Sequence, residues 1–152
     1  MSDFLTFIMQ VEADVVVIIK RIPKEETWEL RHRVLWPDKD LSFIQMREDD
    51  NGLHFGLYEG QELVSVLSLF VNGHDAQFRK FATLPGEQGK GYGSLLLHHV
   101  LLEAASLGAT RIWCNARATK AGYYERFGLQ KTTKEPFEKN GLLYFVMEIQ
   151  LI

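Results

Sequence analysis

Three glycines at alternate positions stand just before a long apolar helical segment. Gly89, Gly91 and Gly93 follow the run that ends in Phe81-Ala82-Thr83, and Ser94-Leu95-Leu96-Leu97 opens the predicted helix. The first backbone N–H groups of a helix have no partner within the helix and carry a partial positive charge, so they can hold an anion such as a pyrophosphate. Glycine lacks the Cβ atom that would keep a phosphate away from these groups. The sequence therefore predicts a phosphate-binding loop.

The spacing of these glycines excludes two common phosphate-binding motifs. The dinucleotide fingerprint G-x-G-x-x-G requires a third glycine where this chain has serine or leucine. The P-loop requires a lysine at the position that Tyr92 occupies. The spacing that fits is Gln-x-x-Gly-x-Gly, formed by Gln88, Gly91 and Gly93.

A second segment follows at a separation that suits one helix and one strand. The β-like run Arg111–Arg117 leads into a predicted helix that Gly128 ends. Two aromatic residues, Tyr123 and Tyr124, stand just before this glycine, in the pattern Tyr-x-x-x-Gly-hydrophobic. Without further information we expect both tyrosines to be core aromatic residues.

Together the two segments resemble the acyl-CoA site of the GCN5-related N-acetyltransferase (GNAT) superfamily. The loop from Gln88 to Gly93, with Phe-Ala-Thr-x-Pro before it, is similar to the superfamily's pyrophosphate loop, and Ala121–Leu129 looks like its second cofactor motif. The resemblance covers about the last half of the chain, while the first half matches only in the order of its elements. It implies an acetyl-CoA-dependent N-acetyltransferase with an α/β fold, whose central sheet is mixed, mostly antiparallel and flanked by helices.

The resemblance also assigns roles to residues. It implies that the strand before the loop pairs with the pantetheine amides, and that a backbone N–H near Ala82 or Thr83 polarises the thioester carbonyl. It also implies that Tyr124 is the general acid, because a phenol with a pKa of about 10 is protonated at neutral pH. Whether Lys90 contacts the phosphates or is a solvated loop lysine stays open, and the short link after Asn115 makes its contact doubtful. The implied cofactor-binding residues are Phe81, Ala82, Thr83, Gln88, Gly89, Lys90, Gly91, Tyr92, Gly93, Ser94 and Asn115.

The general base and the acceptor are not specified by the sequence. The strand before the loop carries no glutamate, so water relayed to Asp75, to His54 or to a backbone carbonyl remains open. We expect Arg31 and Arg33 to be solvated helix charges rather than contacts to an acidic part of the acceptor. A non-catalytic acyl-CoA-binding or sensory module on the same fold is the alternative function.

Composition narrows the remaining function classes. The 152 residues, 46% of them hydrophobic, suffice for a single N-acetyltransferase domain over residues 1–152. The net charge of −3 gives no support for nucleic-acid binding, and no apolar run approaches the roughly 18 residues of a membrane span. We expect a cytoplasmic protein without a signal peptide and without a bound metal, and whether it forms a homodimer stays open. Cys114 is predicted to be a buried structural thiol, and His98 and His99 to be exposed.

Alternation, turn signals and capping residues predict the elements that position these groups. The segment 41–51 is predicted to be irregular with a helical turn. The predicted strands are 14–22, 54–58, 62–70, 75–83, 111–115, 129–134 and 142–149, and the predicted helices are 23–34, 92–107 and 119–127.

Overall fold

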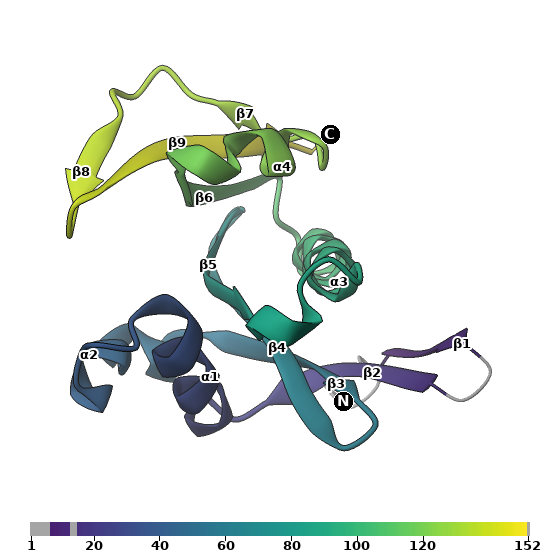
Figure 1. Cartoon of the computed structure of the whole chain (residues 1–152). Coiled ribbons are helices and arrows are strands. Elements are labelled where there is room, and N and C mark those ends of the chain that lie inside the picture. The colour runs from purple at the N-terminus through teal and green to yellow at the C-terminus, as the bar shows by residue number, and fades with distance from the viewer. Residues whose placement is uncertain (1–6, 13–14, 152) are drawn as a thin grey trace.

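The fold is a twisted sheet with helices on both faces (Figure 1). A computed structural model describes residues 7–12 and 15–151, with side chains from residue 16 onward. In this part of the chain the strands follow the order β1-β2-β3-β4-β5-β6-β9-β7, with β8 paired to β9. The strands are β1 (Phe7–Glu12), β2 (Val15–Ile22), β3 (Leu53–Glu59), β4 (Glu62–Asn72), β5 (Asp75–Thr83), β6 (Arg111–Arg117), β7 (Gln130–Lys131), β8 (Phe137–Lys139) and β9 (Leu142–Gln150).

Helices cover this sheet from two sides. In Figure 1, α1 and α2 lie on one side of β5 and α3 lies on the other. The α-helices are α1 (Glu25–Leu35), α2 (Leu41–Ile44), α3 (Tyr92–Ser106) and α4 (Ala121–Glu125), and three 3₁₀ turns are η2 (Arg47–Asn51), η3 (Pro85–Glu87) and η4 (Ala118–Lys120). Within the described residues, none of these helices has the length and apolar character needed to cross a bilayer.

The core forms between the sheet and the apolar face of α3. Leu96, Leu97, Val100 and Ala104 recur at helical spacing and are fully buried. Burying a leucine or valine side chain contributes about 1.5–3 kcal/mol each. This packing fixes α3 against the sheet and so fixes the position of its N-terminus.

The sheet divides between β5 and β6, and this division leaves one edge of β5 unpaired. The two strands pair in parallel only over Asp75–Gln77 and Arg111–Trp113. Beyond these residues β5 continues to pair with β4 and β6 with β9, so Phe78–Thr83 presents an edge without a neighbouring strand among the described residues. A β-bulge in β5 lies at the same place, where Lys80 has a φ of 60°. A bulge bends its strand, and here it lies within the unpaired edge. Figure 1 shows β5 and β6 diverging.

This architecture confirms the predicted mixed, mostly antiparallel sheet, because β5–β6 is the parallel pair among otherwise antiparallel ladders of the described residues. The predicted start of the first strand at residue 14 lies outside the described residues.

Several boundaries differ from the predictions. An additional strand, β1, precedes the predicted first strand, β6 runs to Arg117, and the predicted helix 119–127 is a 3₁₀ turn followed by the short α4. The predicted strand 129–134 is reduced to β7, and β8 forms a hairpin with β9. This hairpin turns at Asn140-Gly141, where both residues have positive φ, the conformation that an Asn-Gly turn favours.

Candidate active site

The loop between β5 and α3 leaves backbone N–H groups available to an anion. Gly89 and Gly91 have φ values of 87° and 85°, which side chains with a Cβ rarely adopt, and a Cβ built on either meets nothing within 4 Å. The N–H groups of Gly89, Lys90 and Gly91 make no hydrogen bond within the described part of the chain. No side chain caps α3, which begins directly after Gly91. This is the geometry that the glycine spacing predicted for a phosphate-binding loop.

The loop is fastened to the end of β5. Gln88 donates a hydrogen bond through Nε2 to the Thr83 carbonyl at 2.9 Å. A Cβ at Gly93 would lie 3.1 Å from Thr83 Oγ1 and 3.2 Å from Phe81 Cζ, so the first turn of α3 packs directly on the strand. The Thr83 hydroxyl also meets Ser65 Oγ at 2.8 Å. The loop, the helix N-terminus and the unpaired edge of β5 are therefore one continuous surface.

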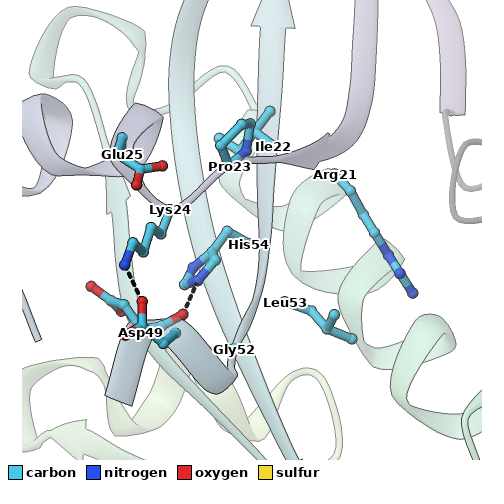
Figure 2. A pocket seen from close by; sticks show the side chains of 10 residues that line it. Arg21, Ile22, Pro23, Lys24, Glu25, Asp49, Gly52, Leu53 and His54 are labelled. Carbon is cyan, nitrogen blue, oxygen red and sulfur yellow. Dashed lines mark hydrogen bonds and ion pairs between the residues drawn. The ribbon is translucent and has the colours of Figure 1, made fainter. Parts of the chain in front are cut away.

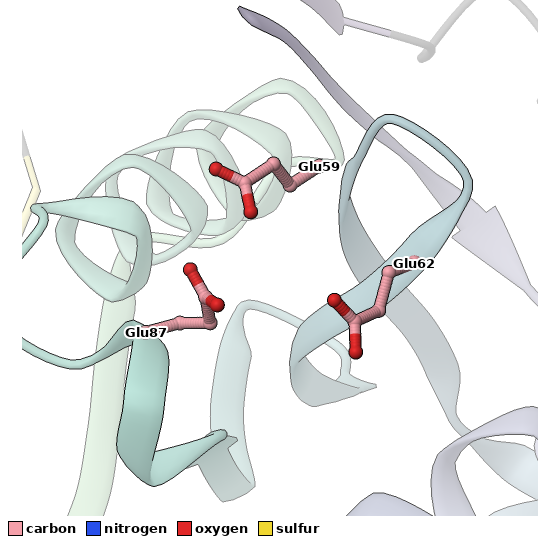
Figure 3. A group of neighbouring side chains, drawn as sticks. All are labelled: Glu59, Glu62 and Glu87. Carbon is pink, nitrogen blue, oxygen red and sulfur yellow. The ribbon is translucent and has the colours of Figure 1, made fainter.

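Lys90 and Tyr92 direct their side chains to glutamates. Lys90 Nζ lies 2.8 Å from Glu87 Oε1, and the Tyr92 hydroxyl donates to Glu59 at 2.5 Å. Figure 3 shows these two glutamates beside Glu62, and carboxylate oxygens of the three lie within 4.8 Å of one another. Two of the three already accept hydrogen bonds from the chain itself. The Tyr92 ring is buried, so its predicted cofactor contact is restricted to its backbone.

Tyr124 lies at the point where β5 and β6 separate. Its ring centroid is 5.7 Å from that of Phe78, the first residue of β5 beyond the parallel pairing. On the other side Tyr124 interacts electrostatically with Cys114 and Arg117 of β6. Burial raises the pKa of the phenol well above its ordinary value, and Arg117 opposes this only in part. Tyr124 therefore keeps its proton at neutral pH in the divided part of the sheet.

Tyr123 connects α4 to the start of α3, a role that the sequence analysis missed. Its hydroxyl lies 2.9 Å from Ser94 Oγ, and its ring lies 6.4 Å from that of Phe81. Burial raises the pKa of this phenol, partly offset by the hydrogen bond to Ser94. The expectation of a core aromatic residue is correct for the ring, which is half-buried, but the hydroxyl is at the loop.

The opposite edge of the division carries polar side chains. Asn115 is exposed on β6, two residues beyond the last pair with β5, and alternates with buried Cys114 and Ala116. Arg117 ends the strand and places its guanidinium 5.7 Å from the centroid of the Trp36 ring at the end of α1. Burial raises the pKa of the Cys114 thiol to about 12, so the predicted structural role is consistent with its environment.

Neither side chain considered as a relay for the general base is free near this edge. Asp75 lies at the start of β5, in the part that pairs with β6, where Arg111 Nη1 is 3.4 Å from its carboxylate. His54 is buried, and its two ring nitrogens lie 2.7 Å from Ser68 Oγ and 2.9 Å from the Asp49 carbonyl. Burial lowers the pKa of His54. These positions favour a backbone carbonyl with water as the relay, and the general base stays a prediction.

The structure corrects the expectation for Arg31. Its side chain is fully buried, not solvated, and donates to Asp49 through both terminal nitrogens at 2.8 and 3.1 Å and to Ser68 at 2.8 Å. Burial opposes ionisation of Asp49, but the bonds from Arg31 outweigh it and the pKa of this carboxyl is lowered. Arg33 is exposed, as predicted.

The prediction for the two adjacent histidines is half right. His98 is exposed, whereas His99 is half-buried with its ring centroid 5.9 Å from that of Phe55. The reason is the angle of about 100° between consecutive helix positions, which turns His99 toward the sheet.

A cavity of about 350 Å³ lies near the Arg31 network but apart from the loop (Figure 2). Lys24 and His54 point toward η2 across it, with Lys24 bonded to Asp50. His54 belongs to β3, which β4 separates from β5. This cavity is therefore not part of the unpaired edge.

Comparison with known proteins places this geometry in a family. The model of the "Acetyltransferase (GNAT) domain" matches residues 36–151. The uncharacterized N-acetyltransferase YitI of Bacillus subtilis (strain 168) is 32% identical over 133 residues, covering 82% of this chain and 89% of the relative. The chain belongs to the GNAT family. It is thus an N-acetyltransferase of the GNAT type.

Solved structures agree on the GNAT fold. The IAA acetyltransferase from Bacillus cereus ATCC 14579 superposes with a TM-score of 0.73 at 20% identity, over 89% of this chain and 99% of that one. A GNAT family acetyltransferase from Elizabethkingia anophelis, solved with acetyl-CoA bound, gives a TM-score of 0.68 at 18% identity, over 89% and 98%.

Sequence reasoning also missed the environment of Lys80. Lys80 is half-buried at the bulge in the middle of the unpaired edge, and burial lowers its pKa to about 8. No local sequence signal marks this residue, because the bulge is set by the register of β5 against β4.

Proposed function

We propose that this protein transfers an acetyl group from acetyl-CoA directly to an amine acceptor within a ternary complex, without a covalent enzyme intermediate. The observation that supports this proposal is that the unpaired edge of β5 leads directly into a loop of free N–H groups at the N-terminus of α3. We further propose that residues 1–152 form one domain for this reaction.

Acetyl-CoA has two features that match this surface. Its diphosphate would be held by the amides of Gly89 through Ser94, where the partial positive charge of α3 adds to the hydrogen bonds. Its pantetheine amides would pair with Phe81–Thr83 in the manner of an added strand. Gln88 would contribute by holding the loop, because its side-chain nitrogen already bonds to Thr83.

The chemistry follows from where the reacting atoms would lie. A neutral amine attacks the thioester carbonyl, and a backbone N–H near Ala82 or Thr83 stabilises the developing oxyanion. The carbon–sulfur bond then breaks, and Tyr124 gives its proton to the departing thiolate. The proton lost by the amine passes to water that a backbone carbonyl orients, and water returns a proton to the Tyr124 phenolate. Asn115, at the opposite edge, would contact the cofactor or the acceptor.

A panel of amines tests this function. The protein is mixed with acetyl-CoA and each amine, and free thiol is followed over time. We expect thiol release that depends on both substrates, and slower release in Gly91→Val when acetyl-CoA is not saturating. Binding of CoA without thiol release for every amine would instead favour the acyl-CoA-binding module.

A further inference from the structure

Cationic side chains gather where β5 bends away from β6. Arg79 and Lys80 belong to the bulged part of β5, Arg117 ends the opposing strand β6, and Lys139 lies on β8. The charges of Arg79, Arg31 and Lys139 all act on Lys80 and lower its pKa, in addition to burial, which is the largest cause. Residues of β5 and β8 therefore place positive charge around one point of the unpaired edge.

The two arginines of this group are held by aromatic rings. The guanidinium of Arg79 lies 5.9 Å from the Phe70 ring centroid, and that of Arg117 lies 5.7 Å from the Trp36 ring centroid. Stacking of this kind orients a guanidinium but leaves its N–H groups, which lie in the guanidinium plane, able to bind an oxyanion. Arg117 also interacts with Tyr124, so one of these cations is next to the proposed general acid.

The positive charge is not balanced by the protein. Within the described residues, Arg79, Lys80, Arg117 and Lys139 take part in none of the ion pairs. Asp49 is the acidic group that acts on Lys80, and both of its oxygens are already bonded to Arg31. A half-buried lysine beside further cations is unfavourable unless an anion binds there. The pantetheine arm of acetyl-CoA carries no charge that could do so.

We propose that Arg79 and Lys80 bind a carboxylate of the acceptor, so that the acceptor class is an amine that also carries a carboxylate. This inference rests on the proposed function, because the cations are assigned to the acceptor only if acetyl-CoA lies along β5. A carboxylate suits the group because a guanidinium can donate two parallel hydrogen bonds to it. Lys139, which is exposed on β8, lies at the outer side of the same group.

A second charged pocket favours a different class of acceptor. It has a volume of about 230 Å³ and is lined by Glu26, Glu29 and Glu62, together with Arg33. A polyamine would fit this acidic lining. The pocket borders Leu84, which follows the end of β5, and not the bulge at Lys80. We therefore place the acceptor at the bulge and treat a polyamine as the result that would contradict it.

The experiment compares matched acceptors on the full-length protein. Phenylalanine, its methyl ester and phenethylamine present an amine with and without a free carboxylate, and spermidine represents the polyamines. Initial rates of thiol release give kcat and KM for each with the wild type and with Lys80→Met. Lys20→Met, which removes an exposed cation on β2, is the matched control.

We expect kcat/KM for the carboxylate-bearing amine to exceed those of the ester and of phenethylamine by at least about tenfold. Lys80→Met should raise KM for phenylalanine at least about fivefold, with little change in kcat, and leave the ester within about twofold. Calorimetry in the presence of CoA gives a readout independent of turnover, in which phenylalanine binding should weaken by the same factor in Lys80→Met but not in Lys20→Met.

Failure of the carboxylate site and failure of the acetyltransferase proposal give different results. Preference for spermidine, or equal use of phenylalanine and its ester with no effect of Lys80→Met, would overturn the carboxylate site and leave the acetyltransferase proposal intact. Binding of CoA with no thiol release from any amine, and no binding of phenylalanine, would contradict both.

Discussion

The proposed cofactor side and the proposed acceptor side of the site use different chemical groups. The loop before α3 offers backbone N–H groups and glycines, and the side chains of Gln88, Lys90 and Tyr92 are bonded within the protein itself. The proposed acceptor side instead presents long cationic side chains from β5 and β8. A backbone site recognises a group that every acyl-CoA shares, whereas side chains can be changed without altering the fold. We infer that donor binding and acceptor choice are separable in this protein.

The largest expected effect is on stability, at the buried pair behind the acceptor side. Asp49→Ala leaves the buried Arg31 without its ionic partner, and we expect the free energy of unfolding to fall by about 3–5 kcal/mol. Urea denaturation measures this change. Asp50→Ala is the matched control because its carboxylate is exposed and bonded to Lys24, and it should change stability little. Equal effects of the two substitutions would show that the Arg31–Asp49 pair does not stabilise this side.

The same pair predicts a pH dependence. The pKa of Asp49 is lowered in the folded state, so its contribution to stability is complete above the ordinary carboxyl pKa of about 4 and is lost as the pH falls through the lower, folded value. The stability of the wild type should therefore fall more steeply in acid than that of Asp49→Asn. Parallel acid-denaturation curves would contradict this.

The next effect separates the two tyrosines. Tyr124→Phe removes the proposed proton donor, and kcat should fall at least about tenfold while the Kd for CoA stays nearly unchanged. Tyr123→Phe removes the bond to Ser94 at the start of α3, and should weaken CoA binding a few-fold with a smaller change in kcat. Steady-state kinetics and calorimetry on both variants test this contrast. Wild-type turnover by Tyr124→Phe would eliminate the proposed acid.

A smaller change in binding is expected at the loop. Gly91→Val places a β-branched residue at a φ of 85°, which costs about 1–2 kcal/mol or shifts the loop, so the Kd for CoA should rise about tenfold. Gly86→Val is the control, since Gly86 has an ordinary φ and open space around its Cβ position. If both variants bind CoA alike, the backbone of the loop is not the anion site.

The smallest effect concerns Lys80 and pH. Burial and the charges of Arg79, Arg31 and Lys139 lower the pKa of this lysine to about 8, and the charge of Asp49 opposes them only in part. Its positive charge is thus present below pH 8 and lost as the pH rises through this value. KM for a carboxylate-bearing acceptor should rise a few-fold between pH 7 and pH 9 in the wild type, and less in Lys80→Arg. Identical profiles would remove Lys80 from acceptor binding.

The loop and the helix after it could be predicted because their signals are local, while the cofactor contacts of the loop stay a prediction. Glycine spacing and the apolar period of the following helix are readable within about twenty residues, and the structure confirms the loop conformation and α3. The position of Tyr124 at the division of the sheet agrees with its predicted role, which itself stays a prediction.

The acceptor side could not be predicted in the same way. Arg31 appeared to be a solvated helix charge because its partners, Asp49 and Ser68, come from η2 and β4, which only the tertiary fold brings together. The unusual φ of Lys80 depends on the bulge and not on a local turn signal. The general base was open for the same reason, since the burial of His54 is decided by residues distant in sequence.

A crystal structure of the protein with CoA tests the central claim most directly. The account predicts diphosphate oxygens within hydrogen-bonding distance of the amides between Gly89 and Ser94, and the pantetheine arm alongside Phe78–Thr83 with its sulfur near Tyr124. CoA bound in the cavity beside His54, or on any other surface with the loop amides facing solvent, would contradict it.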